Sequence, residues 1–378
     1  MIFVRKFVKK GQKNKHMRET IGTDYSIQIP SYTVGPDAYR MIPKYCSLYG
    51  QKAVVIGGHK AMAAAREKLL AATEHSSITI TGFLHYGDEA TYEASEVLQK
   101  DPLVQDADMI FAVGGGKAVD TSKVTALALG KPFFTFPTIA SNCAAASSVA
   151  IMYNPDGSFR EFRHYLDTEK HVFIDTDIIA NAPWEYLWAG IGDTYAKYYE
   201  VSASSRGEQL PHFLATGVTL SRMCMETLLR FGKQAIDDNK AGIVSEALTE
   251  CALTIIMTTG WVSMLVARQH TMDYNGGVAH ALFYSLCELP GFDETHIHGV
   301  VVGFGVLLQL LIFGETEEFE KLRDFNRQIG LPVSFSEIGV TLDQVRQIAP
   351  RMTRDEDVEH FPFKLTVEQV MEAAGKLR

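Results

Sequence analysis

Three side chains in the second half of the sequence are of the types that hold a metal ion. Asp193 follows a Gly-Ile-Gly tripeptide, His280 lies in an apolar stretch, and His298 directly precedes a glycine. One carboxylate and two imidazoles suit a divalent metal and leave one coordination position open to a substrate oxygen. Each also has a structural interpretation, because an aspartate near a helix start commonly caps the helix and a histidine on an apolar face is commonly a core residue. The residue types alone leave both interpretations open.

A glycine triplet in the first half has the properties of a phosphate cradle. Gly114–Gly116 directly follows the apolar run Met109–Val113 and precedes an amphipathic stretch. Glycines let the backbone turn tightly and bring its N–H groups close to an anion, at which the following helix directs its positive end. The pattern is neither the G-x-G-x-x-G fingerprint nor a Walker A loop. We therefore predict a pyrophosphate site here, with a plain strand-to-helix turn as the alternative.

A second loop rich in small residues also follows an apolar run. Residues 136–148 contain several alanines and small hydroxyl side chains. Small side chains at the carboxyl end of a strand permit a flat ligand to approach closely. The alternative is a polar turn that leads into a helix of small residues.

These loops require a parallel sheet to position them, and the first half has the pattern of one. Short apolar runs alternate there with amphipathic stretches, which predicts a doubly wound α/β domain. After about Ile179 the apolar periodicity becomes helical almost throughout. At 378 residues the chain is long enough for two domains of roughly 150 residues or more. We predict a leader at 1–20, an α/β domain at 21–180 with the pyrophosphate site and a helical domain at 181–378 with the candidate metal ligands, with a hinge at Asn181-Ala182-Pro183. The expected strands lie at 53–56, 77–80, 109–113, 133–136 and 171–174, and the expected helices of the second half at 187–203, 213–234, 246–268, 276–286 and 299–313.

Charge is distributed unevenly along the chain. Residues 1–18 carry seven lysines and arginines and no acid, so the rest of this −9 chain is −16. An acidic body argues against a nucleic-acid partner. The basic leader lacks the apolar core of a signal peptide. We interpret it as disordered, or as a misplaced start with Met17 as the true one, and a membrane or nucleic-acid arm is the alternative.

Cysteine usage and hydropathy bear on the compartment. The five cysteines are odd in number and form no C-x-x-C pair, which is typical of a reduced cytoplasmic protein. The most apolar run, 300–313, is shorter than the roughly 18 residues needed to cross a bilayer. It predicts a buried helix, and no membrane partner is expected.

Taken together, the motifs resemble those of the metal-dependent alcohol dehydrogenases of the iron-containing and glycerol dehydrogenase family, which are related in fold to dehydroquinate synthase. The resemblance begins at about Tyr32 and rests on four motifs at 114–123, 137–141, 190–193 and 298–305. It implies that Asp193, His280 and His298 are metal ligands and catalytic residues. It also implies cofactor contacts at Gly58, Gly115, Gly116, Lys117, Asp120, Thr138, Ser141, Ser147, Val149 and Tyr153.

Four positions separate the branches of this family. Lys197 stands where iron-dependent members have a fourth ligand, a histidine, so the site resembles that of the zinc-using glycerol dehydrogenase branch. Cys143 replaces an aspartate that touches the polyol and resembles the hydroxycarboxylate dehydrogenases, which implies a substrate-binding role toward 2-oxo acids. Phe283 replaces a histidine, so a proton relay is absent there. Gly58, followed by His59 and Lys60, replaces a carboxylate that binds the ribose, which makes NADP as acceptable as NAD.

The resemblance implies an oxidoreductase that transfers a hydride between NAD(P)(H) and a small alcohol, ketone or 2-oxo acid, with one divalent metal, zinc being expected. It also implies a homo-oligomer. The alternatives are a dehydroquinate synthase-like or glycerol-1-phosphate dehydrogenase-like enzyme, and a catalytically silent NAD(P)-binding protein. The first two would need more basic residues around the substrate, and retention of all three ligand types argues against the third.

Overall fold

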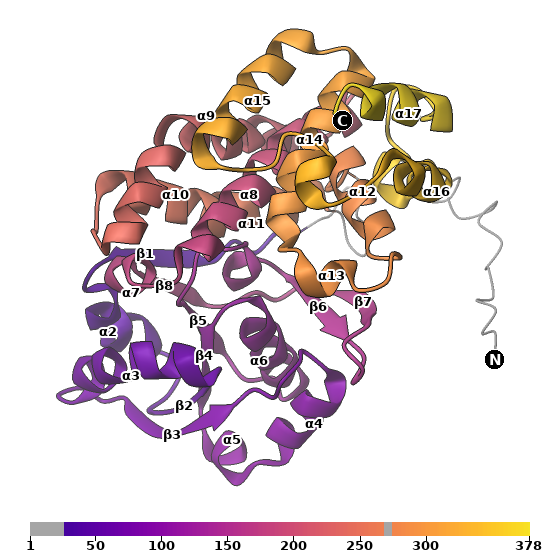
Figure 1. Cartoon of the computed structure of the whole chain (residues 1–378). Helices are drawn as coiled ribbons and strands as arrows, with labels where there is room; N and C mark the ends of the chain where they lie inside the picture. Colours follow the sequence, from indigo (N-terminus) through magenta and orange to yellow (C-terminus); the bar gives the residue numbers. More distant parts are fainter. Residues whose placement is uncertain (1–25, 268–273) are drawn as a thin grey trace.

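The computed structural model describes residues 26–267 and 274–378. The expected leader at 1–20 lies outside the described residues. Figure 1 shows a sheet with its helices in one half of the molecule and a bundle of helices in the other. The change from sheet to helices falls at Asn181-Ala182-Pro183, where Pro183 is the N-cap of the first long helix of the bundle. The domain boundaries themselves stay predictions.

The first half forms a six-stranded parallel sheet. Its order is β1-β8-β5-β4-β2-β3, and all its paired neighbours run parallel. The chain builds outward in opposite directions from β2 and β4, so these neighbours form the switch point at which α/β sheets bind ligands at their carboxyl edge. The predicted fold class is therefore confirmed. The strands are β1 (Ser31–Gly35), β2 (Lys52–Gly57), β3 (Thr79–His85), β4 (Met109–Gly114), β5 (Phe133–Pro137) and β8 (His171–Asp175).

Helices cover both faces of this sheet, as a parallel sheet requires. β4, β5 and β8 are buried along their whole length, and β2 is buried except at Lys52. Phe111, Phe134, Phe136 and Phe173 pack together on one face. The main covering helices are α3 (His59–Thr73), α4 (Tyr92–Lys100) and α6 (Gly116–Ala128), with short α2 (Ile42–Cys46), α5 (Pro102–Asp106) and α7 (Thr176–Ala180).

Three strands were not expected from the sequence. β1 is an edge strand without a fully buried residue, so its hydrophobic signal is weak. β6 (Val149–Tyr153) and β7 (Phe159–His164) form a separate antiparallel hairpin. β7 alternates with charged residues and is mostly exposed, so it lacks the apolar run by which the other strands were identified.

The second half is helical, as expected. The five expected helices correspond to α8, α9, the stretch from α10 to α11, α12 and α14, and α14 is buried along most of its length. The elements are α8 (Trp184–Ser204), α9 (His212–Ala241), α10 (Glu246–Leu253), a π-helical turn (Thr254–Thr258), α11 (Thr259–Val266), α12 (Val278–Leu286), α13 (Phe292–Thr295), α14 (His298–Phe313), α15 (Thr316–Ile329), α16 (Leu342–Met352) and α17 (Val367–Gly375).

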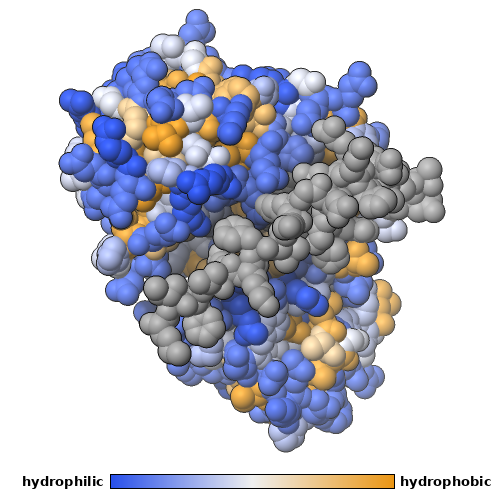
Figure 2. All heavy atoms as spheres, turned by 90° about the vertical axis from the view of Figure 1, so that its right-hand side faces the viewer, coloured by the Kyte–Doolittle hydropathy of each residue, from blue (hydrophilic) through white to orange (hydrophobic). Residues whose placement is uncertain are grey.

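Among the described residues, one helical stretch is long and apolar enough to span a membrane, judged by length and composition alone. It runs over Glu246–Val266, and 72% of its most apolar window is buried inside the protein. A core helix passes the same test, so this is weak evidence for a membrane. Hydrophilic residues predominate over much of the face in Figure 2, with smaller hydrophobic areas between them.

Candidate metal and cofactor site

Three helices bring the three expected metal ligands together. Asp193 is on α8, His280 on α12 and His298 on α14, and their ligand atoms all lie within 4.8 Å of one another. Asp193 Oδ1 is 3.3 Å from His298 Nε2 and 3.6 Å from His280 Nε2. One carboxylate and two imidazoles that converge from separate elements are a donor set suited to a divalent cation. Their role as ligands stays a prediction.

Asp193 lies in the middle of α8, so the interpretation of this residue as a cap near a helix start is wrong. Its preceding glycine serves helix packing instead. A Cβ on Gly192 would come within 2.3 Å of the Gly299 carbonyl oxygen, and one on Gly299 within 2.1 Å of the Ala189 carbonyl oxygen. Because neither position has room for a side chain, α8 and α14 cross at close range. This crossing brings Asp193 to His298.

Glu200 orients His280. Its side chain is fully buried two turns after Asp193 on α8, and its two carboxylate oxygens accept from His280 Nδ1 at 2.7 Å and from the His280 backbone N–H at 3.0 Å. The Nε2 atom is thereby left to face Asp193. A carboxylate behind a histidine is the usual outer contact of a metal-binding imidazole. Glu200 was missed at the sequence level, where its signal is a single acid in an apolar helical stretch, seven residues after Asp193.

The side chains of the cluster shift one another's pKa values. Burial opposes the charged form of His280, but Glu200 and Asp193 outweigh it and raise the pKa of His280 to about 9. Burial also opposes ionisation of Asp193, yet the bond and charge of His298, together with His280, hold the pKa of Asp193 below its usual value. A proton on His280 therefore offsets part of the carboxylate charge in the metal-free state. A metal bound at His280 Nε2 would displace that proton, so its binding releases a proton.

Lys197 and Cys143 lie beside this cluster. The Lys197 ammonium is buried and donates to the Asn275 backbone carbonyl at 2.6 Å and to Asn275 Oδ1 at 2.8 Å. Burial, with the Asp193 charge, outweighs Lys197 and a bond to Ser263 and raises the pKa of Cys143 to about 11, so the thiol is neutral. Phe283 stands edge-on to the His298 ring at 4.4 Å between centroids. An apolar ring therefore occupies the position at which related sequences have a histidine.

The loop after β5 connects the sheet to the metal cluster. A Cβ on Gly190 of α8 would come within 2.4 Å of the Ala140 carbonyl oxygen, and one on Gly260 of α11 within 2.2 Å of the Ala146 carbonyl oxygen. The loop is therefore pressed against two helices of the bundle. It carries Thr138, Ser141, Cys143 and Ser147 in this position.

The glycine triplet forms the predicted turn at the carboxyl edge of the sheet. Gly114 has φ +146°, a conformation open mainly to glycine, and Gly115 is the N-cap of α6 with no side-chain cap. A Cβ on Gly116 would lie 3.1 Å from Asn142 Nδ2, and one on Gly115 only 2.7 Å from Ile139 Cδ1. The two loops singled out in the sequence are thus in contact. Together they present the helix N-terminus that a pyrophosphate would use.

Asp120 and Lys123 have a framework role. Asp120 Oδ2 accepts from the Ile151 N–H at 3.1 Å, and Oδ1 is 3.5 Å from the fully buried Lys123 Nζ. Lys123 also donates to three backbone carbonyls, at distances of 3.0, 2.8 and 2.6 Å. Burial raises the pKa of Asp120 to about 6 against the opposing effects of Lys123 and Ile151. Lys123 was missed as a site residue, although its spacing from Asp120 is that of neighbours on one helix face. The three carbonyls belong to Ala144, Ser147 and Val149.

The other expected cofactor residues fall into two places. Gly58 caps α3 at the end of β2, and a Cβ on Gly114 would lie 4.0 Å from the Gly58 backbone nitrogen. Lys117 pairs with Glu89 at 2.5 Å and lies 5.4 Å from the centre of the Tyr153 ring on the hairpin. The structure therefore groups Gly58, Gly115 and Gly116 at the sheet edge, and places Lys117 and Tyr153 toward the hairpin. Their cofactor roles stay predictions.

Comparisons with known proteins agree with this architecture. Residues 30–176 match the family model described as iron-containing alcohol dehydrogenase. The chain is 30% identical to hydroxycarboxylate dehydrogenase A of Escherichia coli K12 over 86% of this chain and 89% of that protein. It is 30% identical to a glycerol dehydrogenase of Citrobacter freundii over 91% and 94% of the two chains. The crystal structure of glycerol dehydrogenase from Schizosaccharomyces pombe superposes with a TM-score of 0.82 at 27% identity, covering 94% of this chain and 90% of that one.

A parallel-sheet domain joined to a helical bundle, with this sequence similarity, defines a dehydrogenase of the dehydroquinate synthase-like fold. The chain belongs to the iron-containing alcohol dehydrogenase family, in agreement with the expected resemblance. It is an oxidoreductase that acts on alcohol groups. Membership implies dependence on a nicotinamide cofactor and a divalent metal.

Proposed function

We propose that this enzyme uses zinc at Asp193, His280 and His298 to interconvert a small 2-hydroxy acid and its 2-oxo acid. The observation that carries the proposal is the convergence of the metal donors with a buried ammonium, Lys197, and a neutral thiol, Cys143. The similarity to hydroxycarboxylate dehydrogenase A supports it. A polyol has no group that needs a buried cation, whereas a substrate carboxylate does.

The donor set favours zinc over a metal that demands more ligands. Asp193, His280 and His298 supply one oxygen and two nitrogens, and zinc accepts such sets with one position left for the substrate. Lys197 stands one helical turn after Asp193, and its ammonium has no lone pair to donate. When bound, the ion supplies Lewis acidity that polarises the substrate oxygen. Glu200 holds the His280 ring in place for this, and the Phe283 ring walls off one side of His298.

Lys197 is proposed to bind the substrate carboxylate. Asn275 accepts two hydrogen bonds from the ammonium, and within residues 26–267 and 274–378 no third acceptor is found for it. A buried ammonium with a free donor attracts an anion. Cys143 adds no charge that would repel it, because burial keeps the thiol protonated.

The cofactor is proposed to lie along the carboxyl edge of the sheet, with NADP(H) preferred. The loop after β5 leads to the metal donors, so the nicotinamide end belongs there and the adenosine end at β2 and β3. No acid follows β2: Gly58 is followed by His59 and Lys60, and the His59 ring stacks on His85 at 4.0 Å. Imidazole and ammonium groups suit a 2′-phosphate better than the carboxylate that binds a free ribose hydroxyl.

A second candidate is polyol oxidation, which the similarity to the Citrobacter freundii glycerol dehydrogenase favours. Zinc-loaded enzyme assayed on 2-oxo acids, uncharged ketones and glycerol, with NADH and NADPH in parallel, decides between them. We expect the highest kcat/KM with a 2-oxo acid and NADPH. Higher kcat/KM with glycerol contradicts the proposal, and no turnover on any substrate would indicate a silent cofactor-binding protein.

The free cysteines support a cytoplasmic location. All five are free thiols, and none is paired in a disulfide. Reduced thiols are typical of the cytoplasm. Homo-oligomer formation stays an expectation from the family.

A further inference from the structure

The N-terminus of α12, which carries His280, is held by side chains from the two other ligand-bearing helices. Its first N–H group, that of Val278, donates to Gln309 Oε1 of α14 at 2.9 Å. Its third, that of His280, donates to Glu200 of α8 at 3.0 Å. Helices leave their first N–H groups without intrahelical partners, so these bonds replace a local cap, and α12 has no side-chain cap of its own.

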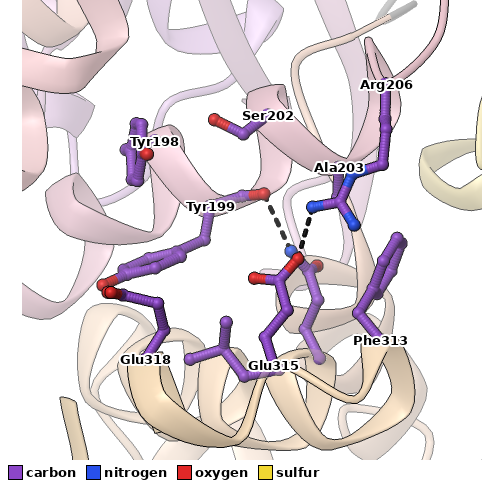
Figure 3. A pocket seen from close by; sticks show the side chains of 10 residues that line it. Tyr198, Tyr199, Ser202, Ala203, Arg206, Phe313, Glu315 and Glu318 are labelled. Carbon is purple, nitrogen blue, oxygen red and sulfur yellow. Dashed lines mark hydrogen bonds and ion pairs between the residues drawn. The ribbon is translucent and has the colours of Figure 1, made fainter. Parts of the chain in front are cut away.

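Gln309 connects all three helices through one amide. While Oε1 accepts from α12, Nε2 donates to the Tyr199 backbone carbonyl of α8 at 2.9 Å. The side chain is 2% exposed, so neither bond can be replaced easily by water. The dashed line at the Tyr199 carbonyl in Figure 3 marks the second bond.

The contact is too close to allow other positions of α12. A Cβ on Gly277, the residue before α12, would lie 2.6 Å from Gln309 Oε1 and 2.8 Å from Glu200 Cγ. Gln309 and Glu200 therefore lie on one side of the same glycine. A shift or rotation of α12 would break both bonds and turn His280 Nε2 away from Asp193, because the ring is fixed to the same helix end.

We propose that Gln309 is a positioning residue of the metal site. It contacts none of the three ligands, but it sets the place of α12 relative to α8 and α14 and so the convergence of Asp193, His280 and His298. This inference rests on the proposed metal site. Outer contacts of metal ligands commonly change metal affinity by about 10–100-fold, and we expect an effect in that range.

A small cavity borders Gln309. It has a volume of about 70 Å³ and lies on α8, α14 and the start of α15, with Gln309 in its lining. Figure 3 shows Tyr199, Arg206, Phe313 and Glu315 around it, with the Arg206–Glu315 ion pair at one side. Removal of the Gln309 amide would enlarge the cavity by the volume of the lost group. A small amide added to the solution can then enter.

The first test compares Zn²⁺ affinity by chelator competition for the full chain and its variants. Gln309→Met keeps the length of the side chain but loses both bonds, and Gln309→Glu keeps an acceptor for Val278 but cannot donate to Tyr199. We expect weaker Zn²⁺ binding by about 10-fold or more in both. The d–d absorption of Co²⁺ in place of zinc should also change, since it reports ligand geometry.

A matched control separates positioning from stability. Asn239 is likewise buried, and its Nδ2 donates to the backbone carbonyls of Ile179, Ala180 and Ala182, which precede α8 and include none of the metal donors. Asn239→Leu should lower the melting temperature but leave Zn²⁺ affinity within twofold of the original chain. Equal losses of Zn²⁺ affinity in the Asn239 and Gln309 variants would reduce Gln309 to a merely structural residue and overturn the proposal.

Chemical rescue gives an independent result. In Gln309→Ala, acetamide replaces the missing carbonyl and N–H groups and should restore Zn²⁺ affinity, whereas acetate, which cannot donate to Tyr199, should not. If Gln309→Met fails to fold, the Glu and Ala variants carry the test. Gln309 variants that bind Zn²⁺ as the original chain does overturn the inference, and an original chain that binds no Zn²⁺ overturns the proposed function instead.

Discussion

Buried carboxylates in the two halves of the molecule have different partners. Asp120 in the α/β half is paired with Lys123, whose ammonium also satisfies three backbone carbonyls. Asp193 in the helical half faces the imidazoles of His280 and His298. The first pair is complete in itself and fixes a loop. The second is a donor set suited to a cation, and it is the proposed metal site.

The same contrast holds for buried histidines. His171 in β8 lies between the hydroxyl groups of Ser31 and Thr33, and burial lowers its pKa to about 4. Burial acts in the same direction on His280, but the carboxylates of Glu200 and Asp193 raise its pKa to about 9. Neutral partners therefore keep His171 uncharged. Anionic partners favour the protonated form of His280, whose proton a metal would displace.

The largest effect is expected at Asp193. Asp193→Asn removes the negative charge that offsets a cation, so Zn²⁺ binding should be lost and turnover should fall on the order of 10³-fold or more. Metal content and kcat measure this. Asp293→Asn, which changes an exposed carboxylate near His298 in sequence, should have little effect on either. An Asp193 variant that retains zinc and turnover would show that the metal site is wrongly placed.

Lys123 should act on stability instead. Lys123→Met leaves Asp120 buried without a counter-charge and three carbonyls without a donor, so the free energy of unfolding should fall by about 3–5 kcal/mol. Urea denaturation measures the loss. The fraction that remains folded should still bind Zn²⁺ normally, because the metal donors are untouched. Loss of Zn²⁺ binding with unchanged stability would reverse the assignment of the two regions.

His171 makes stability depend on pH. Its folded pKa of about 4 is below the ordinary value, so it contributes stability above pH 6.5 that is lost as pH falls through 6.5 toward 4. The loss should reach about 3 kcal/mol at most. Denaturation at several pH values measures it, and His171→Gln, which cannot take up the proton, should show a smaller slope. An unchanged slope would mean that other groups cause the acid sensitivity.

Glu200→Gln tests the partner of His280. The amide still accepts hydrogen bonds but carries no charge to hold the Nδ1 proton, so Zn²⁺ affinity should fall by about 10–100-fold. Chelator competition measures the change. Glu208→Gln, on the loop after α8, is a control that should leave the affinity unchanged. Equal affinities of all three chains would remove Glu200 from the site.

The smallest effect is expected at Gly58. A Cβ there would meet only Tyr86 Cε1, at 3.6 Å, so Gly58→Asp should fold normally. The new carboxylate should repel a 2′-phosphate and weaken NADPH binding by about tenfold relative to NADH. Fluorescence titration of both cofactors measures this without turnover. Gly58→Asn is the uncharged control, and an original chain that prefers NADH would contradict the NADP(H) proposal.

The fold was predictable where a single stretch of sequence carried the signal. Buried strands such as Met109–Gly114 and the apolar helix His298–Phe313 have continuous apolar runs. β1 and β7 lack such runs and were missed, because their pairing depends on neighbours distant in sequence. The sequence predicted Asp193 near a helix start, because glycines such as Gly192 usually interrupt helices. In the structure Gly192 lies inside α8, where its lack of a side chain allows close contact with Gly299.

The site was predictable only in part for the same reason. The residue types of Asp193, His280 and His298 were visible, but the contacts that orient them were not. Glu200 meets His280 across 80 residues of sequence, and Gln309 meets Val278 across 31. The sequence around a buried polar residue on an apolar helix does not show which distant residue it bonds to.

The loop after β5 has a thermodynamic consequence. It touches the glycine turn through Asn142 and Ile139. Through Ala140 it is pressed against Gly190 of α8, three residues before Asp193. One segment therefore borders both the proposed cofactor site and the proposed metal site. If occupancy of one site settles the loop, the other site binds more tightly, and linkage requires the factor to be equal in both directions. Dinucleotide and zinc would then behave as mutual effectors.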